Sequence, residues 1–369
     1  MARGINNKNK WETLANHRRE IDRIDEQIIS LLSKRQEEGA TVGEIKRSLE
    51  VDLFDAAREK EVLDRLCSNA NEHLTPETII NIYGEIISAS RSVQETLKVA
   101  FLGPEANFTH QAALSLFGRS ATLAPAGSVE EIFDMVDKGI CQHGVLAIEN
   151  AFEGSVDGTL DYFCNYELKI CSEILVRIRH HLMSKAESTE NIKILYSHPI
   201  AAAQCRAWIK NHLPKATLRE VESTSLAARM AADEPEAAAL GSNLSAFTYG
   251  LKILEEDIED HPDNVTRFVA IGKTDAQPTG RDKTSILFSV KHSPGTLHKV
   301  LENLARKKIN MCRIESRPIR VRSWEYLFFV DIEGHSRDRD VRTAMKKMEE
   351  CCVFFRQLGS YPVARNPWP

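Results

Sequence analysis

Apolar residues recur at helical spacing through about the first hundred positions of the chain. The pattern predicts three helices: the first and longest over about 11–47, the second beginning near Asp55, and the third continuing to about Leu97. Asp55 is a residue type that caps helix N-termini, and Thr75-Pro76 combines a cap with a first-turn proline. The N-terminal region is therefore predicted to be all-helical.

Polar side chains interrupt the apolar faces of these predicted helices. Arg18 follows Leu14 by four positions and Arg35 follows Leu31 by four, so both arginines point the same way as the apolar residues. Further polar residues on these faces are Lys46, Glu59, Ser90 and Gln94. One long side chain can reach water from such a position, whereas several uncompensated buried charges are costly. The arrangement predicts a polar cavity that binds a dianionic ligand.

With these residues, positions 12–95 resemble the all-helical class of chorismate mutase. The positions that match this family's active site, at matching spacing, are Arg18, Arg35, Lys46, Asp55, Arg58, Glu59, Ser90 and Gln94. In that family the first helix spans two subunits, so the resemblance implies that Arg18 enters the partner's site. A homodimer or a higher homo-oligomer is therefore expected.

From Lys98 the pattern changes to alternating strands and helices, which is typical of an α/β region. Buried strands are predicted over 99–102 and 144–148, and residues 154–156 are predicted to open a helix. Polar groups gather where strands end, at Glu149-Asn150, Ser197-His198 and Ser223-Thr224-Ser225. Ligands bind at such crevices, where helix N-termini offer free N–H groups to anions.

A short stretch, Asp263–Phe268, places a carboxamide, a hydroxyl and a cation close together: Asn264, Thr266 and Arg267. An acidic loop containing Pro262 precedes it, and an apolar strand-like run follows it. Loop residues directly before a rigid strand are frequent sites of binding and catalysis. The structural alternative is a turn in which Asn and Asp satisfy their own backbone.

Residues 98–273 resemble prephenate dehydratase. The motifs that carry this resemblance are Gly103-Pro104-Glu105, Ile148-Glu149-Asn150, Glu153-Gly154-Ser155-Val156, Ser197-His198-Pro199, Ser223-Thr224-Ser225 and Asn264-Val265-Thr266-Arg267-Phe268. The resemblance implies that Thr266 is the hydrogen-bond donor or proton relay to a departing hydroxyl. The residues implied to hold the carboxylates and the ring of the substrate are Asn150, Ser197, Gln204 and Arg267. Asn107 and Ala151 depart from the family pattern, which has a hydroxyl residue and a serine there.

A third pattern follows a polar linker that ends near Lys283. Strand, helix, strand, strand, helix and strand succeed one another, an order that predicts a ferredoxin-like α+β sandwich. The region resembles an ACT domain through the motifs Pro294-Gly295-Thr296-Leu297 and Glu315-Ser316-Arg317-Pro318. The residues implied to bind phenylalanine as an allosteric inhibitor are Gly295, Leu297, Glu315, Ser316 and Arg317. Thr296 and His298 differ from the family's commoner small and apolar residues.

The predicted fold is therefore multidomain: an all-α domain over 10–97, an α/β two-lobed domain over 98–275 and an ACT domain over 283–369. The net charge of −5 does not indicate nucleic acid or an acidic membrane surface as a partner, and no apolar run is long enough to span a bilayer. Eight scattered cysteines without metal-binding spacing, and a polar N-terminus without an apolar signal core, predict a cytoplasmic protein.

Together the three regions resemble a bifunctional chorismate mutase–prephenate dehydratase of phenylalanine biosynthesis. Such an enzyme rearranges chorismate to prephenate and then removes carbon dioxide and hydroxide from prephenate to give phenylpyruvate. Neither reaction implies a metal or an organic cofactor. Two alternatives remain open. In the first alternative, the dehydratase half prefers the aminated substrate arogenate. In the second, the α/β region is a non-catalytic solute-binding module fused to an amino-acid sensor.

Overall fold

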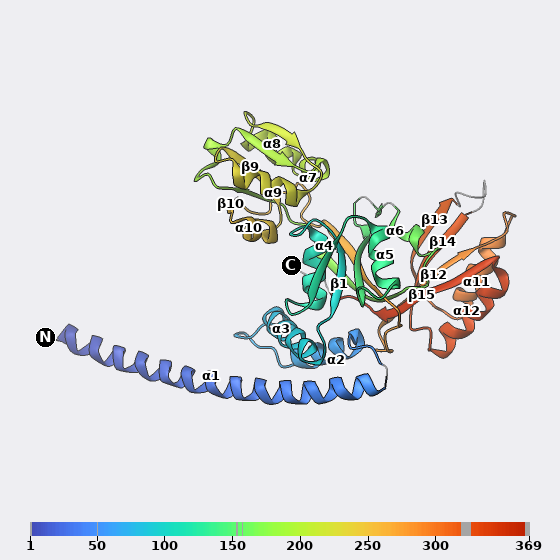
Figure 1. Cartoon of the computed structure of the whole chain (residues 1–369), viewed down its shortest axis with the longest axis horizontal. Helices are drawn as coiled ribbons and strands as arrows, with labels where there is room; N and C mark the ends of the chain where they lie inside the picture. The colour runs from blue at the N-terminus through green and yellow to red at the C-terminus, as the bar shows by residue number, and fades with distance from the viewer. Residues whose placement is uncertain (1, 50, 153, 157, 319–325, 366–369) are drawn as a thin grey trace.

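Three helices build the N-terminal domain: α1 (Ala2–Ser48), α2 (Ala56–Cys67) and α3 (Pro76–Gln94). Figure 1 shows α1 extending far beyond the other two, with its N-terminal half away from the rest of the chain. The structure, a computed structural model, describes residues 2–49, 51–152, 154–156, 158–318 and 326–365, without the side chains of 2–9. Among the described residues, no helix is long and apolar enough to cross a membrane.

The caps predicted from the sequence mark the starts of α2 and α3. The Asp55 carboxylate accepts a hydrogen bond from the backbone N–H of Arg58 at 3.0 Å, and the Thr75 hydroxyl caps α3 in the same way. The predicted end of the third helix is wrong, because α3 stops at Gln94. Leu97 instead leads into the next domain, where it is buried in the core.

The second domain has two lobes, each built on its own sheet (Figure 1). The sheet of the first lobe has the strand order β2-β1-β3-β11-β5, with β4 paired to β3, and the sheet of the second lobe has the order β10-β6-β9-β7-β8. The chain leaves the first lobe after β5 and returns to it with β11. Two chain crossings therefore connect the lobes, and a ligand can bind between them.

Helices follow most of the strands in both lobes. The first lobe comprises β1 (Lys98–Leu102), α4 (Phe108–Phe117), β2 (Thr122–Ala126), α5 (Val129–Asp137), β3 (His143–Asn150), β4 (Gly154–Ser155), α6 (Thr159–Tyr162), β5 (Lys169–Arg177) and β11 (Val265–Gly272). The second lobe comprises β6 (His181–Ser184), the short 3₁₀ helix η1 (Thr189–Asn191), β7 (Ile194–Ser197), α7 (Pro199–Gln204), α8 (Arg206–His212), β8 (Thr217–Glu220), α9 (Thr224–Asp233), β9 (Ala237–Gly241), α10 (Asn243–Tyr249) and β10 (Lys252–Glu255).

Two local predictions for the first lobe are wrong. Thr266 and Arg267 lie inside β11 rather than in a loop before it, because β3 and β5 both pair with this part of the strand. Residues 154–156 do not open a helix, since Gly154–Ser155 form β4 and the next helix begins at Thr159. Thr266 and Arg267 therefore lie on a central strand, where successive side chains point to opposite faces.

The C-terminal domain has the predicted order of strands and helices, and its sheet runs β13-β14-β12-β15. One face of this sheet packs on α11 and α12 through residues such as Phe288, while Leu287 and Tyr361 on the other face join the core of the first lobe. Gly359 allows β15 to approach β5, because a Cβ there would lie 2.2 Å from the carbonyl oxygen of Ile170. The elements are β12 (Asp282–Ser289), α11 (Thr296–Arg306), β13 (Met311–Pro318), β14 (Tyr326–Glu333), α12 (Arg339–Cys351) and β15 (Phe354–Pro362).

Candidate active sites

A row of polar side chains lies where α1 meets α3 and the start of α2. Arg35 donates a hydrogen bond to the Ser90 hydroxyl, and Lys46 donates one to the carbonyl oxygen of Leu53 at 3.0 Å. The Gln94 carboxamide oxygen is buried and has no hydrogen-bond partner among the described residues. A buried acceptor without a donor costs about 1–3 kcal/mol, so a ligand that donates to it would remove this cost. This polar row can bind an anion with cations at both of its ends.

The remaining predicted residues of the helical domain lie around this row rather than in it. Arg18 is exposed on the N-terminal half of α1, Asp55 caps α2, and Arg58 forms an ion pair at the surface. Glu59 pairs with Arg91 at 3.4 Å, at the border with the first lobe. Burial raises the pKa of the Glu59 carboxyl, although the nearby cations counteract part of this effect.

Arg91 was not predicted as a functional residue. Its guanidinium donates to the carbonyl oxygen of Phe117 at 2.8 Å and lies over the rings of Phe54 and Phe117, 5.4 and 5.7 Å from their centroids. Phe117 ends α4, so Arg91 joins the helical domain to the first lobe. Its spacing of four positions from Ile87, which places both on one helix face, was the signal that could have identified it.

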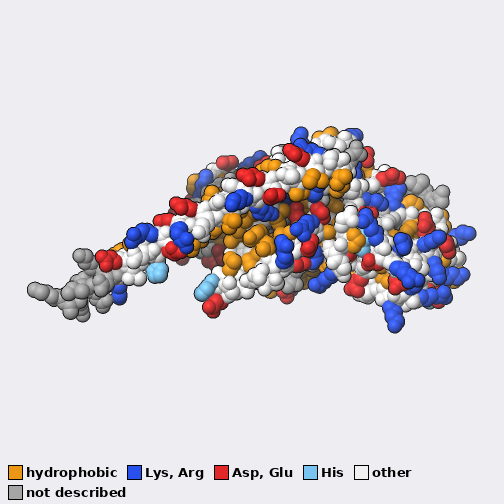
Figure 2. All heavy atoms as spheres, turned by 90° about the horizontal axis from the view of Figure 1, so that it is seen from below, with side chains coloured by type: hydrophobic (Ala, Val, Ile, Leu, Met, Phe, Trp, Pro, Cys, Tyr) orange, Lys and Arg blue, Asp and Glu red, His pale blue; other side chains and the backbone are white. Residues whose placement is uncertain are grey.

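Residues 11–31 of α1 present apolar side chains to solvent, and Figure 2 shows exposed hydrophobic side chains gathered along the helical domain. Ile21 and Leu31 are 56% and 64% exposed. The exposed large apolar residues of this part of α1 are Trp11, Leu14, Ile21, Ile24, Ile28, Ile29 and Leu31. An apolar stripe of this length is typical of a surface that binds another chain.

A cavity of about 370 Å³ lies between the two lobes of the second domain. The ends of β1, β3 and β11 and the N-termini of α4 and α9 meet there. Its polar lining includes Asn107, Thr109, Asn150, His180, His198, Gln204, Glu222, Ser223, Thr224 and Thr266. In the described part of the chain no lysine or arginine lines it, so first-turn backbone N–H groups and polar side chains are the donors available to an anion.

Thr266 and Asn150 meet in this cavity across the paired strands β11 and β3. Asn150 Nδ2 donates hydrogen bonds to Thr266 Oγ1 and to Asn264 Oδ1, both at 2.8 Å. Because the threonine oxygen accepts this bond, its own hydrogen can be donated toward a bound molecule. Both residues are largely removed from water, at 7% and 9% exposure, and hydrogen bonds are electrostatically stronger in such surroundings.

His180 is a residue of this cavity that sequence reasoning missed. Its Nε2 lies 2.9 Å from Oε1 of Gln204, which the structure places in the cavity as predicted. Burial lowers the pKa of His180 to about 4, so the imidazole is neutral near pH 7. The adjacent histidines at 180–181 were the available signal.

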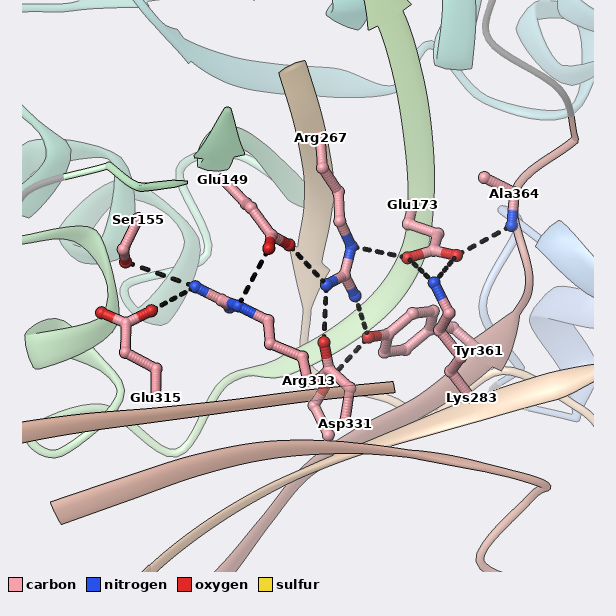
Figure 3. A network of polar contacts seen from close by, with 11 residues as sticks. Glu149, Ser155, Glu173, Arg267, Lys283, Arg313, Glu315, Asp331, Tyr361 and Ala364 are labelled. Atoms are coloured by element: carbon pink, nitrogen blue, oxygen red, sulfur yellow. Dashed lines mark hydrogen bonds and ion pairs between the residues drawn. The ribbon is translucent and has the colours of Figure 1, made fainter. Parts of the chain in front are cut away.

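Two predicted residues lie outside the cavity. Ser197 is fully buried at the end of β7 and donates its hydroxyl hydrogen to the carbonyl oxygen of His198 at 3.0 Å. Arg267 lies on the other face of β11 from Thr266 and contacts the C-terminal domain (Figure 3). The prediction that Arg267 holds a substrate carboxylate in this cavity is therefore wrong, because the strand alternation directs its side chain away from the cavity.

A second cavity, of about 280 Å³, lies in the C-terminal domain beside the start of α11. Gly295 and Leu297 line it, together with Tyr326 and Phe328 of β14. Glu315, Ser316 and Arg317 do not line this cavity. Glu315 bridges two arginines of β13, and one of them, Arg317, reaches Ser155 of the first lobe.

Three family models match successive parts of the chain. The chorismate mutase type II model matches residues 17–95, the prephenate dehydratase model matches 99–276, and the ACT domain model matches 284–350.

Relatives with the same three parts cover almost the whole chain. A bifunctional chorismate mutase/prephenate dehydratase from Aquifex aeolicus is 44% identical over 96% of this chain and 99% of its own length. The protein of the same name from Pseudomonas aeruginosa is 37% identical over 93% of this chain and 96% of its own length. The crystal structure of prephenate dehydratase from Arthrobacter aurescens in complex with L-phenylalanine has a TM-score of 0.67 and 35% identity, and covers 72% of this chain and 90% of that one.

Proposed function

The chain belongs to the family of bifunctional chorismate mutase/prephenate dehydratases, and on this premise we propose which of its residues perform the two reactions. It is an isomerase and a lyase in one chain, which rearranges chorismate to prephenate and converts prephenate to phenylpyruvate by decarboxylation and dehydration, with feedback inhibition by phenylalanine. The full-length relatives favour neither an arogenate-specific dehydratase nor a solute-binding module without catalysis.

We assign the mutase reaction to the polar row between α1 and α3. The rearrangement needs no covalent catalysis, so the protein must hold the reactive conformer and stabilise the charge that develops as the ether bond breaks. Arg35 donates two parallel hydrogen bonds to a substrate carboxylate. Lys46 and the Gln94 carboxamide flank the ether oxygen, and Glu59 accepts a hydrogen bond from the substrate hydroxyl. Three or four charge-assisted bonds of about 1.5–3 kcal/mol each can supply roughly 8 kcal/mol, about a million-fold in rate.

A second copy of the chain completes this site. Arg18 lies on the part of α1 that leaves its own domain, so it cannot join Arg35 within one chain. If the apolar stripe of α1 packs against the same stripe of a second copy, Arg18 of each chain enters the site of the other. A homodimer is therefore the assembly that we propose.

We assign the dehydratase reaction to the cavity between the lobes. As carbon dioxide leaves prephenate, the electron pair of the broken carbon–carbon bond enters the ring, and the ring hydroxyl departs on the far side. Thr266 donates a hydrogen bond to that hydroxyl or relays a proton to it, so that it leaves as water. Asn150 keeps the threonine hydrogen available, while the first-turn N–H groups of α4 and α9 bind the carboxylates.

We place the phenylalanine site in the cavity beside α11. The first-turn N–H groups of α11, after Gly295, bind the carboxylate of the amino acid, and Leu297 contacts its ring. Glu315, Ser316 and Arg317 then act from β13, the edge strand of the sheet, which a second copy can approach. Changing Glu315 to Ala is expected to raise the half-inhibitory concentration of phenylalanine about tenfold while prephenate turnover persists. An unchanged value would exclude Glu315 from the regulatory site.

The limits of the three domains and the cellular location are also proposals. The positions of the three matched segments support domain limits of 10–97, 98–275 and 283–369. All eight cysteines are free thiols, which is typical of a reducing compartment such as the cytoplasm.

The hydrogen bond from Asn150 to Thr266 inside the cavity between the lobes carries the dehydratase assignment. Steady-state assays of the purified protein with chorismate, prephenate and arogenate test the overall function. We expect turnover of chorismate and prephenate, with kcat/KM for arogenate at least about tenfold below that for prephenate. A higher kcat/KM for arogenate would overturn the choice of substrate, and no turnover of either acid would leave the solute-binding alternative.

A further inference from the structure

Strands β3 and β11 carry two cross-strand pairs that lie back to back. Thr266 is in register with Asn150, and Arg267 is in register with Glu149. The first pair lines the dehydratase cavity, whereas the second pair lies on the opposite face of the sheet, next to the ACT domain (Figure 3). A shift of the Arg267 backbone therefore moves the proposed proton donor directly.

All three nitrogen atoms of the Arg267 guanidinium are used by protein groups. Nε donates to Glu173 Oε2 at 2.7 Å, Nη1 to Asp331 Oδ2 at 2.5 Å, and Nη2 to the Tyr361 hydroxyl at 2.8 Å. Glu149 accepts a further, longer bond from Nη1 at 3.4 Å. Asp331 and Tyr361 belong to the ACT domain, so this domain provides two of the four partners.

The partners of Arg267 are themselves fixed. Ser285 donates to Asp331 at 2.5 Å and lies 2.6 Å from the Tyr361 hydroxyl. Glu173, whose side chain is fully buried, accepts bonds from Lys283 at 3.0 Å and from the backbone N–H of Ala364 at 2.8 Å. Buried charges paired in this way tolerate few alternative arrangements, because separating one pair leaves an uncompensated charge. The ACT sheet therefore defines the place of the guanidinium and of the strand that carries it.

We propose that Arg267 is a positioning residue of the dehydratase, which acts through Thr266, and that Asp331 and Tyr361 of the ACT domain hold it in place. The inference rests on the proposed role of Thr266 and extends it. The ACT domain then supports the dehydratase site in the absence of phenylalanine as well as regulating it. A displacement of a reacting group by about 1 Å can lower a rate by about a hundredfold, so a modest change at Arg267 is enough to affect turnover.

The Tyr361→Phe variant tests this support without removing a charge. It deletes the hydroxyl that accepts from Arg267 and keeps the buried ring. We expect the dehydratase kcat to fall about tenfold with KM within about twofold, while the mutase rate of the same chain is unchanged and reports intact folding. Tyr166→Phe is the matched control, because it removes a comparable bond to Asp134 at 2.7 Å in the same lobe, away from β11. This control should leave both activities at the parent level.

A double-mutant cycle with Thr266→Ala separates positioning from general stability. If Tyr361 acts through Thr266, Tyr361→Phe has no further effect on kcat in the Thr266→Ala background. A tenfold loss in both backgrounds, or an unchanged kcat in the parent background, would overturn the inference. A normal kcat for Thr266→Ala alone would instead show that the proposed role of Thr266 is at fault.

Arg267→Lys provides a second variant if Tyr361→Phe fails to fold. A lysine keeps the charge but cannot donate in three directions from one planar group. We expect a loss of kcat of about a hundredfold at nearly constant KM. A raised KM with unchanged kcat would mean that Arg267 binds the substrate itself, and the inference would be wrong.

Discussion

The mutase and dehydratase sites both receive a dianion, but they offer it different donors. The polar row of the helical domain offers the cations of Arg35 and Lys46. The cavity between the lobes has no lysine or arginine among its described lining residues, and it offers helix N-termini, Thr266 and Asn150 instead. On the proposed assignments, the same substrate charge is bound by flexible side chains in one domain and by fixed backbone dipoles in the other.

This difference follows from how each site is assembled. A long helix can carry an arginine out of its own domain and into another subunit, so a cationic site can be shared between chains. Backbone N–H groups at a helix N-terminus are placed by the packing of that helix on its own sheet, and such a site is complete within one chain. The mutase should therefore depend on assembly, and the dehydratase should depend on the packing of its lobes and of the ACT sheet.

Removing a cation of the polar row should produce the largest difference between the mutase and dehydratase activities. In Arg35→Ala the substrate carboxylate loses its partner in a buried site, at a cost of roughly 4 kcal/mol, so the mutase kcat/KM should fall about a thousandfold. Prephenate turnover should stay within about twofold, because Arg35 lies outside that cavity and no arginine lines it among the described residues. Arg65→Ala, at an exposed position of α2, is the control. Separate assays of the two activities, one with chorismate and one with prephenate as substrate, provide the measurement. A folded Arg35→Ala protein that lost both activities would contradict the separation of the sites.

Removing the hydroxyl of Thr266 should have the next largest effect. One preorganised donor contributes about 100- to 1,000-fold to kcat, so Thr266→Ala should lose about two orders of magnitude in dehydratase kcat with little change in KM. Thr266→Ser keeps a hydroxyl at the same place and should recover most of the rate. Steady-state kinetics with prephenate measure both variants, and a near-normal kcat for Thr266→Ala would remove Thr266 from its role.

A charge on the apolar stripe of α1 should weaken the mutase by dissociating the dimer. Ile28 is 47% exposed in the single chain, and Ile28→Asp would bury a carboxylate in the proposed dimer interface. At micromolar protein the mutase rate should fall about tenfold and recover as the concentration is raised, while the dehydratase rate stays constant. Ile140→Asp, at a similarly exposed site on the first lobe, is the control. Sedimentation showing an intact dimer without mutase activity would argue against this cause.

The elements that were predicted correctly depend on local chemistry. Asp55 and Thr75 cap helices because their side chains reach N–H groups three residues further along the chain. The orientation of Arg267 was missed because β11 pairs with β3 and β5, segments about a hundred residues away, and this pairing extends the strand across Thr266. A local pattern cannot show how far such pairing reaches.

The site residues show the same difference between local sequence signals and tertiary structure. The family resemblance identified Gln204 and Thr266, which the structure brings into one cavity, but it did not show that Ser197 is buried beside that cavity. His180 was missed because its role arises from burial between two lobes, and burial of this kind is a property of the tertiary fold. Arg91 was missed because its partners, the ring and the carbonyl of Phe117, lie in another domain.

The smallest expected effect concerns His180, a buried imidazole that lines the dehydratase cavity. His180 is 2% exposed and its pKa is lowered to about 4, against about 6.5 in an unfolded chain. Between these values the unfolded chain binds the proton and the folded chain does not. The contribution of neutral His180 to stability is therefore complete above pH 6.5, declines as the pH falls, and is lost below about pH 4, a change of about 3 kcal/mol.

His180→Asn should remove this part of the pH dependence, because asparagine does not titrate. Between pH 7 and pH 4.5, we expect the Tm of the parent protein to fall a few degrees further than the Tm of the variant. Thermal unfolding of the two-lobed domain provides the measurement. His73→Asn is the matched control, since His73 is exposed and its replacement should leave the parent's slope unchanged. Equal slopes for the parent and His180→Asn would show that the cavity does not resist protonation. In that case the contrast between a mutase site with cations and a dehydratase cavity without them would hold only near neutral pH.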